Sequence, residues 1–204
     1  SAVICPDYSE ASKFADIWLS VKQGTDAALA MAMGHVILRE FHVDRQVPYF
    51  TDYAKRYTDM PMLVRLVRQD GRLVPERFLR ASDLEGSLGE DNNPEWKTLA
   101  VDEASGEIVA PRGTVAGAED GFEDVAFPYF GNIAHDHFTG TDHASILERR
   151  VPVKRIATAE GEALVATVYD LFLANYGVDR GFGGANVAAS LDADEPYTPA
   201  WAER

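Results

Sequence analysis

Ala2-Val-Ile-Cys-Pro-Asp-Tyr8 opens the chain, and Lys22-Gln-Gly-Thr-Asp26 leads into a long alanine-rich stretch. The first run is typical of a β-strand followed by a short polar turn that carries Asp7. The second is typical of a helix start, because Gly24 permits a tight turn and Thr25 or Asp26 can cap the helix. An acidic turn after a strand and a glycine-containing loop before a helix are parts from which α/β sheets build nucleotide sites.

The stretch between these two runs predicts a second strand, and the stretch after them predicts two helices. Residues 15–19 look extended. Apolar residues with helical spacing predict a long helix from Asp26 to about Phe41. Pro48 suits the first turn of a second helix, over residues 48–57.

The remainder of the chain is richer in strand signals. Residues 60–67 predict a strand, and Asp70-Gly71 predicts the turn of a hairpin. A short helix is expected from Ser82-Asp83 through Leu88, and a second hairpin is expected around Ser105-Gly106. Residues 152–156 predict a strand. A final helix is expected over residues 164–176, with Gly177 as the left-handed residue that ends it.

These elements predict an α/β fold: a partial Rossmann-like sheet with flanking helices, plus a small β-rich subdomain. We expect three parts, namely a nucleotide-binding α/β part over residues 1–68, a β-hairpin and loop insertion over 69–150, and a strand-helix return with a C-terminal loop over 151–204. Because the chain begins inside an apolar strand, we expect it to be a fragment of a larger multidomain subunit.

Composition excludes several classes of function. The chain has 204 residues and a net charge of −14, which argues against partners such as nucleic acid or an anionic membrane surface. No apolar run of about 18 residues is present, so we expect no direct membrane insertion. The single cysteine, Cys5, permits no intrachain disulfide and gives no support to a cysteine-rich metal site. We expect it to be buried in apolar surroundings.

The nucleotide interpretation assigns a role to each polar group of the two opening runs. Asp7 can accept hydrogen bonds from ribose hydroxyls or from the N–H groups of a guanine edge. The backbone N–H groups of Gly24, Thr25 and Asp26, with the side chain of Lys22, can face a phosphate, and Asp26 can instead read a base edge. The alternative is an ordinary strand–turn–helix. Residue types alone favour that alternative, because neither GxGxxG nor a Walker lysine is present.

Other candidate sites are weaker. The residues with metal-ligand character are His135, His137, Asp142 and His143. They fall in an expected surface loop, so we predict no metal site there. The carboxylate pairs Asp83/Glu85 and Glu119/Glu123 look like solvated charges. An aromatic patch over residues 127–130 is expected to pack in the interior rather than receive a partner chain.

Several motifs, in this order, resemble the molybdopterin oxidoreductases. They are Val3-Ile-Cys-Pro-Asp-Tyr-Ser9, Ala15-Asp-Ile-Trp-Leu19, Lys22-Gln-Gly-Thr-Asp-Ala-Ala-Leu29 and Tyr57-Thr-Asp-Met-Pro-Met-Leu-Val64. Further runs narrow the resemblance to the catalytic alpha subunits of membrane-bound respiratory nitrate reductases. Among them are Asn92-Asn-Pro-Glu-Trp-Lys97, Leu173-Ala-Asn-Tyr-Gly177 and Tyr197-Thr-Pro-Ala-Trp201. The chain departs from that family at residues 111–124, which are shorter, at the histidine-rich loop, at Tyr8 (often Arg) and at Gln23 (often Pro).

The resemblance implies reduction of nitrate to nitrite at a molybdenum held by two molybdopterin guanine dinucleotides. It also implies 4Fe-4S clusters, a beta iron–sulfur subunit, a cytochrome b gamma subunit that oxidises quinol, and a peripheral location at the cytoplasmic face of the membrane. The residues that it places at the dinucleotide are Asp7 and Tyr8 near the guanosine, and Gln23, Gly24, Thr25 and Asp26 near the guanine and phosphate.

The family's cluster motif and its molybdenum-ligating aspartate are not in this chain, so we expect the fragment alone to hold no cofactor and to be inactive. Two alternatives remain open. One is an acidic, non-catalytic interaction or scaffold domain. The other is a fragment of another molybdenum oxidoreductase, of the chlorate or selenate type.

Overall fold

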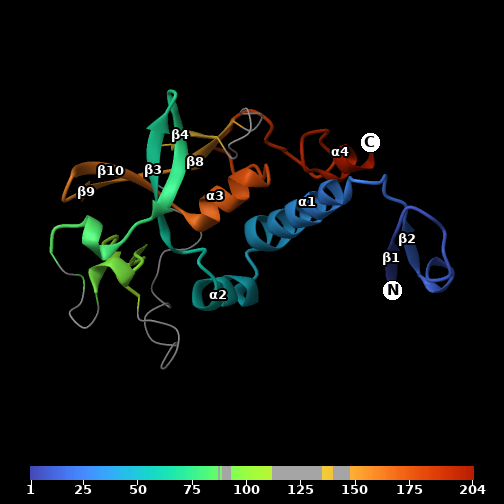
Figure 1. The fold of residues 1–204 in the computed structure, drawn as a ribbon, viewed down its shortest axis with the longest axis horizontal. Helices are drawn as coiled ribbons and strands as arrows, with labels where there is room; N and C mark the ends of the chain where they lie inside the picture. The colour runs from blue at the N-terminus through green and yellow to red at the C-terminus, as the bar shows by residue number, and fades with distance from the viewer. Residues whose placement is uncertain (87, 89–92, 112–134, 140–147) are drawn as a thin grey trace.

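The computed structural model describes residues 1–86, 88, 93–111, 135–139 and 148–204, with residues 135–139 and 148 described as backbone. A small pair of strands, β1 and β2, lies at one end of the molecule, and a larger sheet lies at the other (Figure 1). The long helix α1 (Asp26–Ile37) joins them, and α3 (Val168–Asn175) lies between α1 and the larger sheet.

The opening strand pair is parallel, as an α/β arrangement requires. β1 (Ala2–Ile4) pairs with β2 (Ile17–Leu19), with Ala2 opposite Ile17 and Ile4 opposite Leu19. A 3₁₀ turn, η1 (Ser12–Phe14), connects them.

The expectation that Cys5 is buried in apolar surroundings is wrong. Cys5 is half-buried, its thiol donates to the carbonyl of Asp7 (2.9 Å), and it lies 3.3 Å from Ser12 Oγ. The physical reason is that β1 and β2 form a pair with most of its side chains exposed.

The helical region begins where the sequence predicts and runs further. α1 starts at Asp26 and continues without interruption into a π-helical stretch, η2 (Leu38–Asp44). α2 spans Pro48–Tyr57, as predicted, with proline in its first turn. The short helix α4 (Pro199–Glu203) lies against α1 near the C-terminus (Figure 1).

The larger sheet has six strands in the order β8-β7-β4-β3-β10-β9, drawn from all three of the expected parts of the chain. Its neighbours pair antiparallel except β4 and β7. Asp70 and Gly71 take positive φ values of 50° and 80° between β3 and β4, which confirms the predicted hairpin turn. The strands are β3 (Leu63–Gln69), β4 (Arg72–Phe78), β7 (His135–Thr139), β8 (Glu148–Pro152), β9 (Lys154–Thr158) and β10 (Gly161–Thr167).

The core lies on both faces of this sheet. Because successive side chains of a strand point to opposite faces, Val165 and Ala166 of β10 belong to different apolar clusters. One cluster joins the sheet to α3, and the other joins it to the hairpin of β5 (Ala100–Val101) and β6 (Ile108–Val109). That hairpin confirms the turn predicted at Ser105-Gly106.

Two predicted helices are corrected by the structure. Residues 164–167 are strand rather than helix, because they pair with β3, and α3 begins only at Val168. The helix expected from Ser82 through Leu88 is a single 3₁₀ turn, η3 (Ala81–Asp83). A further 3₁₀ turn, η4 (Pro94–Trp96), follows it. Gly177 has a φ of 67°, which confirms its predicted place after α3.

Candidate nucleotide site at the ends of β1 and β2

The two segments singled out in the sequence lie at the same edge of the strand pair. Since β1 and β2 run parallel, the turn after β1 and the loop after β2 both leave from their carboxyl ends. The N–H of Cys5 donates to the carbonyl of Leu19 (3.2 Å), and Ser20 Oγ donates to the carbonyl of Pro6 (3.1 Å). Leu19 and Ser20 are therefore in direct contact with the turn, and the chain continues from them through the loop of residues 22–26 into α1 (Figure 1).

Two carboxylates at this edge face solvent. Asp7 and Asp26 are both exposed, and among the described residues the structure gives neither side chain a hydrogen bond or an ion pair. Gln23 is also exposed. The ring of Tyr8 packs edge-on against Trp18, with ring centroids 5.1 Å apart. An arrangement of this kind leaves both carboxylates able to accept hydrogen bonds from a ligand.

The loop before α1 differs in detail from the expectation. The N–H of Thr25 donates to the carbonyl of Lys22 (3.1 Å), and Thr25 Oγ1 donates to the same carbonyl (2.6 Å). The Thr25 N–H is thus engaged within the loop instead of facing a ligand, and its hydroxyl does not cap the helix. Gly24 has a φ of 79°, and a Cβ built there meets no atom within 4 Å. The tight turn is as predicted, and the space beside Gly24 is open.

Lys22 lines an apolar groove of about 900 Å³. Its ammonium donates to the carbonyl of Arg204 (2.8 Å), which links the loop to the end of α4. Residues that line the groove include Leu19, Leu29, Met33, Val36, Trp201 and Ala202. Asp7 and Asp26 do not line it, but Ser20, Lys22 and Thr25 do, so the groove adjoins the carboxylate edge.

The histidines of the helical region belong to the core rather than to a ligand site. His35 is fully buried, with Nδ1 2.7 Å from the carbonyl of Tyr176, and burial lowers its pKa. Burial likewise lowers the pKa of His42, whose ring packs near Tyr169. Asp142 and His143 lie outside the described residues, as do the side chains of His135 and His137, Glu119 with Glu123, and the aromatic patch. Within the part that is described, no three potential metal-ligating side chains gather into a site.

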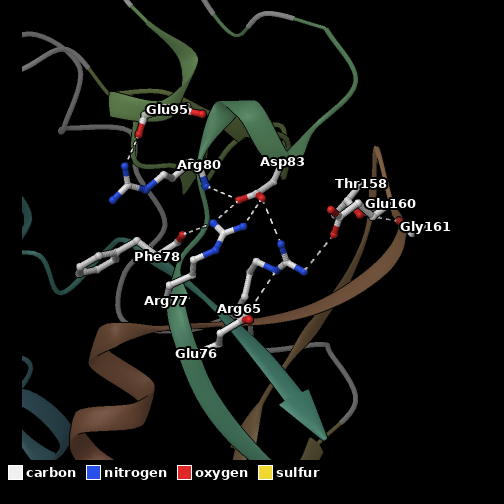
Figure 2. A network of polar contacts seen from close by, with 10 residues as sticks. All are labelled: Arg65, Glu76, Arg77, Phe78, Arg80, Asp83, Glu95, Thr158, Glu160 and Gly161. Carbon is white, nitrogen blue, oxygen red and sulfur yellow. Dashed lines mark hydrogen bonds and ion pairs between the residues drawn. The ribbon is translucent and has the colours of Figure 1, made fainter.

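An ion-pair network braces the larger sheet (Figure 2). Asp83 accepts hydrogen bonds from the side chains of Arg65 (3.0 Å) and Arg77 (2.8 Å) and from the N–H of Arg80 (2.9 Å). The hydrogen bond from Arg77 is the main cause that lowers the pKa of Asp83 to about 2. Arg65 also reaches Glu76 (3.5 Å) and Glu160 (3.8 Å), so the network joins β3, β4, η3 and the turn before β10. Every carboxylate in this network is paired with arginine, which indicates that the network has a structural role.

Within the described residues, no helix has the length and apolar character needed to span a bilayer.

A family model described as molybdopterin oxidoreductase matches residues 1–195 of this chain. The chain belongs to this family. It is 47% identical over its whole length to respiratory nitrate reductase 1 alpha chain of Escherichia coli, of which it covers 19%. It is 42% identical to nitrate reductase alpha chain of Bacillus subtilis, over 98% of this chain and 18% of that one. It is 32% identical to dimethylsulfide dehydrogenase subunit alpha of Rhodovulum sulfidophilum, over 57% of this chain and 11% of that one. The chain thus spans about a fifth of the length of the first two relatives.

The residues at the carboxyl edge offer acceptor groups and open space to a ligand. Asp7 and Asp26 offer acceptors without competing partners among the described residues, and Gly24 leaves room for a close approach to the backbone. Sequence reasoning missed the side chains by which this chain holds the turn of Asp7, namely Trp18 and Ser20. Their spacing of two in a strand, which puts both on one face, is the pattern that could have indicated them.

Proposed function

We propose that this chain is part of the catalytic alpha subunit of a quinol-linked nitrate reductase, in which it forms one wall of a molybdopterin guanine dinucleotide site. The proposal is supported by the family membership and by the identity to two nitrate reductase alpha chains over nearly the whole chain. The single observation that carries the site is that the Asp7 turn and the chain leading to Asp26 both leave from the carboxyl ends of the parallel strands β1 and β2.

The chain's own part in the reaction is to bind and orient the nucleotide. Asp7 accepts from ribose hydroxyls or from the guanine N–H groups, and Asp26 reads a base edge at the start of α1. Tyr8 and Gln23 border these carboxylates, and Gly24 and Thr25 shape the loop that approaches the phosphate. The positive end of the α1 dipole favours the anionic cofactor at this place. When bound, the cofactor supplies the molybdenum centre at which nitrate gains two electrons and two protons to give nitrite and water.

The complete subunit would work with partners that this chain does not contain. We propose a beta subunit with 4Fe-4S clusters, a cytochrome b gamma subunit that oxidises quinol, and a peripheral position at the cytoplasmic face of the membrane. The chain alone is expected to turn over no nitrate and to retain no molybdenum. Stoichiometric molybdenum in the purified 204-residue chain would contradict this.

The test is made in the full-length subunit with Asp7→Asn and Asp26→Asn. Each removes a charged acceptor, and the loss of a hydrogen bond to a charged group lowers the affinity for the nucleotide about tenfold or more. The measurement is the guanine nucleotide released per subunit after acid treatment, with circular dichroism to show that the fold is kept. Glu10→Gln, an exposed acid bonded to Lys13 (2.9 Å), is the matched control.

Unchanged nucleotide content in both aspartate variants would overturn the site and favour a scaffold role for this part of the chain. If nucleotide is lost as expected, the rate with nitrate compared with chlorate and selenate identifies the substrate. Faster reduction of chlorate or selenate would overturn the assignment as a nitrate reductase while leaving the cofactor site in place.

A further inference from the structure

Three successive carbonyl groups of the turn after β1 each accept a hydrogen bond from a side chain. The carbonyl of Cys5 accepts from Trp18 Nε1 (3.1 Å). The carbonyl of Pro6 accepts from Ser20 Oγ (3.1 Å), and that of Asp7 accepts from the thiol of Cys5 (2.9 Å). Two of these three donors come from β2 and the residue that follows it. The backbone path of the turn is therefore set from the neighbouring strand.

Trp18 makes a second contact with the same turn. Its ring meets Tyr8 edge-on, with centroids 5.1 Å apart, so the indole contacts both the residue before Pro6 and the residue after Asp7. Ser20 lies two residues further on, and side chains with this spacing share one face of an extended chain. Together, Trp18 and Ser20 thus hold the turn before and after the peptide bond between Pro6 and Asp7.

The Asp7 carboxylate itself is held by nothing among the described residues, and Asp7 is exposed. Its direction is fixed only through the backbone on which it stands. A carboxylate that must meet a ligand in one orientation loses affinity when its backbone moves, because the ordering must then be achieved on binding.

We infer that Trp18 and Ser20 are positioning residues for the cofactor nucleotide, which act by holding the turn that presents Asp7. This inference rests on the proposed function, and it deepens that proposal by adding the residues that hold Asp7 in the orientation needed to bind the nucleotide.

The experiment uses the full-length subunit prepared without cofactor and then loaded with purified molybdopterin guanine dinucleotide at increasing concentrations. Nucleotide content at each concentration gives an apparent affinity, and thermal unfolding of the cofactor-free subunit reports stability separately. Ser20→Ala and Trp18→Phe each remove one donor, and Trp18→Phe keeps a ring against Tyr8. We expect each to weaken loading about two- to tenfold, the range for one neutral hydrogen bond, with the unfolding midpoint unchanged. Ser20→Thr keeps a hydroxyl and is expected to restore loading.

Matched controls come from exposed residues far along the chain, Ser190→Ala and Trp96→Phe, which are expected to load as the unaltered subunit does. Because Ser20 acts through Asp7, Asp7→Asn combined with Ser20→Ala is expected to load no worse than Asp7→Asn alone. Full additivity in that pair, or failure of Ser20→Thr to restore loading, would overturn the positioning role.

The outcomes also separate this inference from the proposed function. Normal loading in Ser20→Ala and Trp18→Phe, with poor loading in Asp7→Asn, would overturn the positioning role alone. Normal loading in all three would overturn the role of Asp7 in the nucleotide site as well.

Discussion

At the scale of single residues, Asp83 is held by hydrogen bonds from Arg65, Arg77 and Arg80 (Figure 2). Its pKa of about 2 lies below the ordinary value of 3.8, so folding favours the ionised form. A carboxylate with a lowered pKa contributes stability above its unfolded pKa and loses that contribution as the pH falls through the folded value.

Asp83→Asn is therefore expected to lower the free energy of unfolding at pH 7 by about 1–2 kcal/mol, allowing for solvent screening. The difference from the unaltered chain should shrink between pH 4 and pH 2, where Asp83 becomes protonated. Urea unfolding at a series of pH values measures it. Glu162→Gln, in an exposed pair with Arg155 (3.4 Å), is the control and should cost much less. If Asp83→Asn lowers the free energy of unfolding by the same amount down to pH 2, the ionised form of Asp83 is not the source of the stability.

Gly34 of α1 lies against the ring of Tyr176, the residue that follows α3. A Cβ at this position would overlap Cε1 of Tyr176, whose carbonyl also accepts from His35. Gly34→Ala is expected to destabilise the chain by about 1–3 kcal/mol through overpacking, measured by urea unfolding. Pairing it with Tyr176→Ala removes the obstructing ring, so the added cost of Gly34→Ala should then nearly vanish. An equal cost in both backgrounds would show that the ring is not the cause.

At the scale of elements, the caps of α1 and α3 look alike in sequence and differ in the structure. Thr167 Oγ1 accepts from the N–H of Asp170 (3.0 Å) and donates to the Asp170 carboxylate (2.7 Å), and both residues are buried. Asp170 also pairs with Arg180 (2.7 Å), although burial still raises its pKa to about 6. Thr25 stands at the same position of α1 but bonds to Lys22.

Thr167→Ala is thus expected to cost about 1–2 kcal/mol of unfolding free energy, whereas Thr25→Ala should cost only a few tenths because no helix N–H loses a partner. Urea unfolding of the two variants, side by side, tests this. Equal costs would mean that the hydroxyl of Thr25 caps α1 in solution.

The elements that sequence alone predicts well are those fixed by local chemistry. Pro48 at a first turn and Asp70-Gly71 at a hairpin specify their backbone directly, and α2 and the β3–β4 turn are found where expected. Residues 164–167 were predicted wrongly because a short apolar run suits a helix or a buried strand equally. Pairing with β3, which is distant in sequence, decides in favour of the strand.

The same limit applies to the candidate site. The turn of Asp7 and the loop of Asp26 were recognisable from strand, glycine and acid. Two further features are not recognisable from the sequence: the hydrogen bond of the Thr25 N–H within the loop, and the hydrogen bonds from Trp18 and Ser20 to the turn. These contacts depend on how β2 is placed beside β1. Local sequence patterns show which residues can take part in a binding site. Tertiary pairing determines which of their hydrogen-bonding groups are free to meet a ligand.

At the scale of the whole molecule, the groove between α1 and α4 is a large apolar surface open to solvent. Met33 and Ile37 remain 52% and 43% exposed along it, an exposure that favours binding of apolar ligands. Lys22, Glu203 and Arg204 also line the groove.

The isolated chain is therefore expected to enhance the fluorescence of 8-anilinonaphthalene-1-sulfonate, and Leu29→Glu, in the groove, should reduce that enhancement severalfold. Tyr53→Glu places the same charge on the exposed face of α2, outside the groove, and should leave the dye signal unchanged. Equal loss in both variants would indicate general unfolding, and no loss in Leu29→Glu would place the dye elsewhere.

We propose that the Asp7 turn and the Asp26 loop bind one nucleotide between them. The most direct test is an experimental structure of the full-length subunit with its cofactor bound. We predict that the guanosine part of the cofactor lies at the carboxyl ends of β1 and β2, with donors about 2.7–3.2 Å from the carboxylates of Asp7 and Asp26. A cofactor nucleotide that contacts neither carboxylate would contradict the account.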